Sequence, residues 1–381
     1  MSDAYRSAGV DYEALDAGKR SALTEALATS ELLRAAGGQA LDESRGEPAF
    51  VFEAGGRTLG FVVEGLGTKS IIARQVDEEL RGSGIESAAP GGGASGFGNV
   101  AYDTVAAIVN DLCCVGALPL VVNAYFATGS SDWYDSRDRH EALLAGWREA
   151  CADAGATWGG GESPSLPGLV APHDIELAGS AVGLVPDGRR PILGRHLAPG
   201  DEIVLVASSG LHANGASLAR AVADRLPERY RTALPSGRTF GEALLDRSLI
   251  YTGLVRALLA GQADVHYLSH ITGHGLLKLM RPRRELTYRI TWLPAVPEVL
   301  EFLVDQSGMS PAEAYSTFNM GCGFAVYCAA GAGVEVVRIA TRLGLSAGVA
   351  GAVEEGPRRV LLEPVDVVFE SGDMDLTPRG E

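Results

Sequence analysis

The sequence predicts a two-domain α/β protein with mixed layers of helices and strands. A chain of 381 residues is longer than one ordinary hydrophobic core accommodates. In each half, apolar stretches typical of strands alternate with stretches of helical composition, which favours α/β layers over sandwiches or helix bundles. The composition shifts at Pro186–Pro191, so we expect an N-terminal domain over residues 1–186 and a C-terminal domain over residues 187–381.

Hydrophobic pattern and turn signals predict the elements of the N-terminal domain. Residues 1–20 are polar and predict an arm with little regular structure, whereas residues 21–38 have helical composition and end at a glycine pair. Apolar runs at 49–53 and 59–63 predict a β-hairpin, because the glycines between them suit a tight turn. The pattern also predicts helices at 70–81, 102–115 and 135–154, strands at 118–124 and 176–184, and an irregular glycine-rich loop at 90–96.

The C-terminal domain shows the same alternation of element types. Its polar tail, residues 371–381, is expected to be frayed. Strands are expected at 202–208, 286–292, 323–328, 346–353 and 359–369, and helices at 216–226, 246–260, 297–306 and 334–343.

Charge and cysteine content exclude several classes of partner. The net charge is −16, which argues against a nucleic-acid partner or an anionic membrane surface. Any phosphate must then be bound by backbone amides, single basic residues or a metal. No apolar run is long enough to span a bilayer. The five cysteines lack metal-binding spacing, so we expect reduced thiols in a cytoplasmic protein.

The most informative stretch runs from Phe61 to Lys69, where an apolar strand enters a tight loop. Glu64 offers a carboxylate for a metal, and the Gly65–Thr68 backbone offers N–H groups that can approach a phosphate. The alternative is a strand that ends in a glycine turn with a surface lysine, since the spacing is not that of a Walker loop. The functional interpretation predicts phosphate contacts at Gly65, Gly67, Thr68 and Lys69.

Polar side chains interrupt the apolar helix predicted over 102–115. Asp103 and Asn110 lie two turns apart on nearly one face, and Asp111 is displaced from them by about a quarter turn. A carboxylate in such a helix is costly unless it is capped, paired or bound to a metal. Asp103 can cap the helix N-terminus. Asp111 has apolar neighbours, which favours it as a ligand of magnesium or of a substrate group.

A second glycine loop, Ser208–Gly215, joins a strand to a helix and contains His212 and Asn214. Backbone N–H groups at the start of the helix can receive an anion. The histidine can serve as a general acid or base, or donate to a phosphate. A merely exposed or hydrogen-bonded histidine is the alternative.

A third glycine loop contains Thr272 and Gly273. His266, His270 and His274 recur every four residues around it. The glycines at 273 and 275 interrupt the helix that such a zinc site would need, so we do not expect zinc. The glycines at 159–161 indicate either a close backbone approach or a plain loop.

In their order and spacing, these motifs resemble the aminoimidazole ribonucleotide synthetase family, the phosphoribosylformylglycinamidine cyclo-ligases. The resemblance extends from Tyr5 to about Val353, and it depends on the whole series and not on one motif. The matching stretches are Ala8–Asp11, Gly67–Lys69, Val109–Leu112, Tyr125–Gly129, Gly160–Ser163, Ser208–Gly210, His212, Asn214–Gly215, His270–Gly273 and Thr317–Asn319.

The resemblance implies a homodimer formed by the N-terminal sheet, a C-terminal α/β domain, and ATP bound in a cleft near the subunit interface. The implied reaction uses ATP and Mg²⁺ to activate the formyl oxygen of formylglycinamidine ribonucleotide, which then cyclises to aminoimidazole ribonucleotide. Glu64, Asp103 and Asp111 would hold the magnesium triphosphate. The implied nucleotide and substrate contacts are Gly65, Gly67, Thr68, Lys69, Asn110, His212, Asn214, Thr272, Gly273 and Asn319.

Several positions depart from the usual family pattern, and they bear on substrate identity more than on nucleotide binding. They are Glu64, where aspartate is usual, Ser165, where glutamate is usual, Ala124, His274 and Met320. Two alternatives stay open. One is another ATP-dependent small-molecule kinase or ligase of the same superfamily. The other is a non-catalytic nucleotide-binding paralogue, against which the retained carboxylates, Glu162 included, argue.

Overall fold

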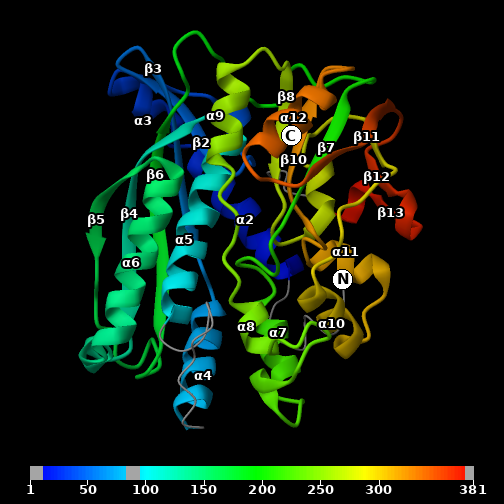
Figure 1. Cartoon of the computed structure of the whole chain (residues 1–381). Coiled ribbons are helices and arrows are strands. Elements are labelled where there is room, and N and C mark those ends of the chain that lie inside the picture. The colour runs from blue at the N-terminus through cyan, green and yellow to red at the C-terminus, as the bar shows by residue number, and fades with distance from the viewer. Residues whose placement is uncertain (1–11, 83–94, 374–381) are drawn as a thin grey trace.

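The computed structural model describes residues 12–82 and 95–373, which form two β-sheets with helices packed around them (Figure 1). The predicted α/β class is confirmed. The stretch Ala8–Asp11, most of the loop expected at 90–96 and residues 374–381 of the expected tail lie outside the described residues. Strands before residue 186 form one sheet and strands after residue 201 form the other. The exact domain boundary stays a prediction.

Counted over the described residues, the first sheet contains six strands, with Gly55 and Gly56 in the turn of the predicted hairpin. In spatial order they are β1 (Gly38–Ala40), β2 (Phe50–Ala54), β3 (Arg57–Gly65), β6 (Ile175–Leu184), β4 (Leu118–Thr128) and β5 (Thr157–Glu162). Both turn glycines have left-handed φ angles, 56° and 72°, so the hairpin prediction is confirmed. Strand β5 was not predicted, because its consecutive glycines lack the branched side chains typical of strands. It pairs in parallel with β4 at the sheet edge.

The helices around the first sheet are α2 (Tyr12–Leu27), α3 (Ser30–Ala35), α4 (Lys69–Gly82), α5 (Ser95–Cys114) and α6 (Arg137–Ala154). Helices α5 and α6 run side by side along the sheet (Figure 1). Glycines permit their close approach, because a Cβ on Gly146 would lie 1.9 Å from the carbonyl oxygen of Gly98. The arm predicted over residues 1–20 is wrong from Tyr12 onward. Alanine, leucine and glutamate recur through that stretch and favour a helix despite its polarity.

The second sheet has seven strands among the described residues. In spatial order they are β13 (Val367–Glu370), β12 (Arg359–Leu362), β9 (Leu286–Ile290), β11 (Ala347–Glu355), β7 (Glu202–Ala207), β10 (Cys322–Cys328) and β8 (Val265–His270). Strand β10 is buried along its whole length, which explains its uninterrupted apolar sequence. Strand β8 was not predicted, because His266, Ser269 and His270 interrupt its apolar pattern.

The helices of the second half are α7 (Ala216–Ala223), α8 (Phe240–Leu244), α9 (Thr252–Ala260), α10 (Glu298–Ser307), α11 (Pro311–Thr317) and α12 (Gly333–Arg342). The helix predicted over 246–260 is wrong in its first turns, since α8 ends at Leu244 and α9 begins only at Thr252. Helix α11 was missed, although Ser310 and Glu313 form a capping box. No helix in the described ranges is long and apolar enough to cross a bilayer.

The irregular segment 245–251 is held against helix α5 by hydrogen bonds between the two halves of the chain. The backbone N–H of Ser248 donates to Oδ1 of Asp103 at 2.6 Å. Asn110 accepts from the backbone N–H of Tyr251 and donates to the carbonyl oxygen of Leu249, both at 2.8 Å. These bonds explain why the segment leaves the helical path, and they fix the position of one half of the chain relative to the other.

Candidate active site

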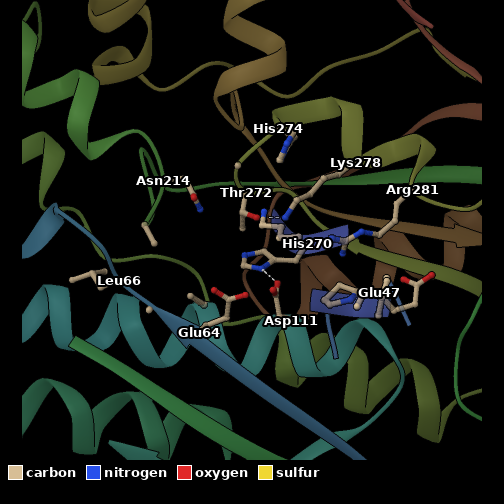
Figure 2. A pocket seen from close by; sticks show the side chains of 18 residues that line it. Glu47, Glu64, Leu66, Asp111, Asn214, His270, Thr272, His274, Lys278 and Arg281 are labelled. Atoms are coloured by element: carbon tan, nitrogen blue, oxygen red, sulfur yellow. Dashed lines mark hydrogen bonds and ion pairs between the residues drawn. The ribbon is translucent and has the colours of Figure 1, made fainter. Parts of the chain in front are cut away.

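A cavity of about 410 Å³ lies between the two halves of the chain (Figure 2). The first half contributes helix α2, residues 46–48, the end of β3 and helix α5 to its lining. The second half contributes residues 213–214 and the stretch from the end of β8 through the 3₁₀ helix η4 (Gly275–Met280). A concave site between two domains, with converging polar groups, is the usual location of a small-molecule site.

Two carboxylates, Glu64 at the end of β3 and Asp111 on α5, form one side of the cavity, which we call the acidic wall (Figure 2). Nδ1 of His270 donates to Oδ1 of Asp111 at 2.6 Å. Burial raises the pKa of Glu64 to about 7, and the neighbouring charge of Asp111 adds to that increase. Burial also acts to raise the pKa of Asp111, but the hydrogen bond and charge of His270, together with the charges of Lys278 and Arg281, outweigh it and lower that pKa.

Two cations, Lys278 on η4 and Arg281 just after it, form another side of the cavity, which we call the basic wall (Figure 2). Nζ of Lys278 donates to the hydroxyl of Thr272. Burial lowers the pKa of Lys278 to about 8, although the charge of Asp111 opposes the change. The cavity therefore presents opposite charges on two sides, and it suits a ligand that carries both a metal and a free anionic group.

Six of the sequence-predicted site residues line this cavity. They come from four separate segments, and the fold brings them together as the predicted metal and nucleotide contacts require. They are Glu64, Gly65, Asp111, Asn214, Thr272 and Gly273.

Lys69 and Asp103 do not line the cavity. Nζ of Lys69 lies 2.5 Å from Oδ2 of Asp103, and both side chains are fully buried. Nζ also donates to the carbonyl oxygen of His212 at 2.8 Å. The predicted contacts of Lys69 with phosphate and of Asp103 with metal therefore find no support in this geometry. Asp103 is also no helix cap, because α5 begins eight residues earlier, at Ser95.

His212 is buried beside the cavity, not on its surface. The backbone N–H of Ser209 donates to its Nε2 at 3.2 Å, and its Nδ1 has no hydrogen-bond partner among the described residues. Burial holds the pKa of His212 well below the ordinary histidine value. This environment favours a neutral imidazole that shapes the loop, and it gives no support to the predicted general acid or base.

Four further predicted contacts lie outside the cavity lining. Asn110 is occupied by its bonds to the segment 245–251, and Asn319 donates to the carbonyl oxygen of Gly210 at 2.9 Å. The hydroxyl of Thr68 lies 3.0 Å from that of Ser217. Gly67 has a left-handed φ of 70° and forms the turn that precedes α4. These residues shape the loops around the cavity.

Several lining residues were not predicted as site residues: Lys19, Glu47, His270, Lys278 and Arg281. His270 was named in the zinc spacing and in the matching stretch His270–Gly273, but no role in the site was predicted for it. The hydroxyl of Tyr267 donates to Oε2 of Glu47 at 2.7 Å, across a sequence distance that no local pattern reveals. One signal was available for Lys278, because a single charge inside the apolar run Leu276–Met280 is unusual unless it serves a site.

The acidic wall fits a magnesium ion that is shared with a ligand. No group of three or more metal-binding side chains occurs within residues 12–82 and 95–373. Mg²⁺ is commonly held by one or two carboxylates, with substrate phosphates and water completing its shell. Glu64 and Asp111 are two such carboxylates, and the raised pKa of Glu64 reflects its burial and the neighbouring charge of Asp111, both of which a divalent cation would offset.

Family models match both halves of the chain. Residues 46–185 match the AIR synthase related protein N-terminal domain, and residues 198–362 match the corresponding C-terminal domain. The fold and the site between its halves therefore define an AIR synthase related protein of two domains.

Sequence identity to curated relatives identifies the family within this class. A phosphoribosylformylglycinamidine cyclo-ligase of Sorangium cellulosum (strain So ce56) is 36% identical over 370 residues, 93% of this chain and 96% of the relative. Another, of Anaeromyxobacter sp. (strain Fw109-5), is 39% identical over 272 residues, 70% of this chain and 77% of the relative. The chain belongs to the phosphoribosylformylglycinamidine cyclo-ligase family.

Solved structures support the fold. The hydrogenase maturation protein HypE in complex with ATP matches with a TM-score of 0.56 at 17% identity, and the match covers 82% of this chain and 83% of that one. At this identity the likeness concerns the fold and not the reaction.

Proposed function

We propose that the protein catalyses the ATP-dependent cyclisation of formylglycinamidine ribonucleotide to aminoimidazole ribonucleotide, a step of purine biosynthesis. The observation that carries this proposal is the 36% identity with a curated cyclo-ligase across 93% of the chain. The alternative kinases and ligases of the superfamily have less support, since both curated relatives reported above are named cyclo-ligases.

In the proposed reaction the formyl oxygen of the substrate attacks the γ-phosphorus of ATP, and the bond from that phosphorus to ADP breaks. The amidine nitrogen then attacks the formyl carbon, the ring closes, and phosphate leaves with the former formyl oxygen. An amide oxygen leaves poorly, and phosphorylation makes it a good leaving group. Catalysis then depends mainly on holding the reactants in line and neutralising charge.

The cavity residues have roles consistent with this chemistry. Glu64 and Asp111 would hold magnesium, which would screen the triphosphate charge. His270 keeps Asp111 ionised and oriented through its 2.6 Å hydrogen bond. The Gly65 backbone, Asn214 and the Thr272–Gly273 turn provide polar groups for the nucleotide and the substrate.

A direct assay tests the proposed function. Purified protein is mixed with ATP, Mg²⁺ and formylglycinamidine ribonucleotide, and aminoimidazole ribonucleotide is measured, with thiamine phosphate as the control substrate. The proposal predicts product and ADP in equal amounts from the ribonucleotide alone. Phosphorylation of thiamine phosphate without cyclisation of the ribonucleotide would refute this proposal and indicate a kinase instead.

We also propose that the protein is a cytoplasmic homodimer. Phe61, Val63 and Val121 are 39%, 64% and 37% exposed on one face of the first sheet. Val182 pairs in register with both Phe61 and Val121, so this apolar surface is continuous across three strands. The same face of a second copy is a matching partner. Five buried free thiols suit a reducing compartment.

A further inference from the structure

The basic wall is the part of the cavity that the proposed magnesium site leaves unexplained. Lys278 is only 6% exposed, and Arg281 is half-buried. Within the described ranges neither cation forms a direct ion pair with a carboxylate, although the charges of Asp111 and Glu64 act on Lys278 and those of Glu47 and Asp111 act on Arg281. The hydroxyl of Thr272 is the partner of Nζ of Lys278, and Nε of Arg281 has no hydrogen-bond partner in the described ranges. Two cations on one side of a cavity, with no direct ion pair of their own, leave N–H groups available to an anionic ligand.

The use of lysine in this chain supports the same conclusion. Of 32 basic residues, only Lys19, Lys69 and Lys278 are lysines, and the others are arginines. Lys19 and Lys278 line the cavity, and Lys69 lies behind it in the buried pair with Asp103. On an exposed surface the two residue types serve equally as charges. Two of the three lysines therefore lie at the cavity, where a compact ammonium group can make contacts that differ from those of a guanidinium.

The two walls discriminate between two kinds of phosphate. A bare phosphate would be repelled by Glu64 and Asp111, so the acidic wall suits a triphosphate that brings its own magnesium. A phosphate monoester without a metal needs cations supplied by the protein. The planar fork of Arg281 can hold two phosphate oxygens, and the ammonium of Lys278 can hold a third.

We propose that Lys278 and Arg281 bind the phosphate monoester of the ribonucleotide substrate. This inference rests on the proposed function for the identity of the substrate, but the site itself is defined by its chemistry as one for a metal-free phosphate monoester. The substrate is thereby oriented with its phosphate at the basic wall and its reacting end toward the acidic wall.

The rival explanation is that the basic wall only balances the charge of the acidic wall. In that case Lys278→Gln and Arg281→Gln would weaken binding of magnesium ATP or alter the acidic wall, and a phosphate monoester would bind no better than its neutral counterpart.

Binding measurements separate these explanations without the reaction. Ribose 5-phosphate is titrated by calorimetry into the full-length protein in the presence of EDTA, with ribose as the neutral control. We expect ribose 5-phosphate to bind and ribose not to bind. Lys278→Gln and Arg281→Gln should each weaken binding about tenfold or more, since each removes a charge-assisted contact. Arg342→Gln, a matched loss of charge in the last turn of α12 and outside the cavity, should leave binding unchanged.

Kinetics provide the second test. In the cyclisation assay, the two cavity variants should raise the KM for the ribonucleotide about tenfold or more and leave the KM for ATP unchanged. A raised KM for ATP instead, or unchanged binding of ribose 5-phosphate in both variants, overturns the inference. If Lys278→Gln does not fold, the half-buried Arg281 decides the question alone. If the wild-type protein binds ribose 5-phosphate but forms no product, the proposed function is refuted, whereas the proposed phosphate monoester site stands.

Discussion

Asp111 shows how a buried carboxylate can stay ionised inside an apolar helix. Val109, Leu112 and Val115 around it are buried and apolar, and its own burial disfavours the charge. The hydrogen bond from Nδ1 of His270 compensates, and the charge is then available to the cavity. His270 comes from β8 in the other half of the chain, so the ionised carboxylate depends on the two halves being assembled.

Asp111→Asn is expected to lower kcat by at least about 100-fold while the protein stays folded, because the substitution removes the charge and keeps the shape. Steady-state kinetics and the thermal unfolding midpoint measure the two effects. Asp305→Asn on the exposed side of α10 is the matched control and should retain activity. Wild-type turnover in Asp111→Asn would remove this carboxylate from the mechanism.

The burial of His212 predicts how the free energy of unfolding depends on pH. Its pKa is lowered in the folded protein, so the unfolded chain binds a proton near pH 6.5 that the folded protein does not. Its contribution to stability is therefore lost as pH falls below that value, by up to about 1.4 kcal/mol for each pH unit.

In His212→Asn that loss should be smaller, and asparagine tolerates the left-handed φ of 61° at this position. Urea unfolding between pH 7.5 and 5.0 measures the difference in the free energy of unfolding. An identical pH dependence in variant and wild type would contradict the role assigned to burial.

The sequence predicted part of the site, for reasons visible in single residues. Glu64 and Asp111 were found because each is a carboxylate next to an apolar run or inside one. Lys69 was misinterpreted because a lysine after a glycine turn looks exposed, and only the tertiary structure reveals Asp103 beside it. Lys278 was missed although it is a lone charge in an apolar run, because the 3₁₀ helix that carries it has no clear sequence pattern, and Arg281 directly follows that helix.

Among the elements, α5 does most to organise the site. One face carries Asp103 and Asn110, which bind the segment 245–251 of the other half, and the adjacent face carries Asp111 toward the cavity. The helical spacing predicted this separation of faces correctly, but it could not tell which face would meet ligand. A polar residue in an apolar helix can be satisfied either by a hydrogen bond to a distant backbone group or by a bond to a metal. The sequence of the helix is the same in both cases, so it does not distinguish them.

The contact between α4 and α5 depends on the buried pair of Lys69 and Asp103. Lys69→Met leaves Asp103 buried without its partner, and we expect a loss of about 3–5 kcal/mol in the free energy of unfolding. Lys69→Met combined with Asp103→Leu should recover part of that loss, because no uncompensated charge remains. Urea unfolding gives both values. Arg34→Met, in an exposed pair with Glu31, is the control and should change stability little.

Element prediction succeeded where the pattern was local. The hairpin of β2 and β3, helix α4 and strand β10 have regular patterns and clear ends, and all were predicted. Strand β8 failed because its polar residues are satisfied by partners distant in sequence, such as Asp111 for His270.

At the scale of the whole molecule, the proposed dimer follows from one uncovered sheet face. Val63→Asp puts a charge at the centre of that face and should convert dimers to monomers, because an unpaired charge would be buried between the copies. Light scattering coupled to size exclusion measures the mass. Val334→Asp on α12 is the matched control, since that valine is 72% exposed elsewhere, and it should stay dimeric. A monomeric wild type would end this proposal.

The scarcity of lysine has a practical consequence. An amine-reactive reagent finds Lys69 inaccessible, so Lys19 and Lys278, both at the cavity, are the side chains left for it to modify. A simple acylating reagent would thus act as an affinity label for the cavity, and peptide mass mapping would locate the modified lysines. Protection of these two amines by an added compound would report occupancy directly, even for compounds that are never turned over.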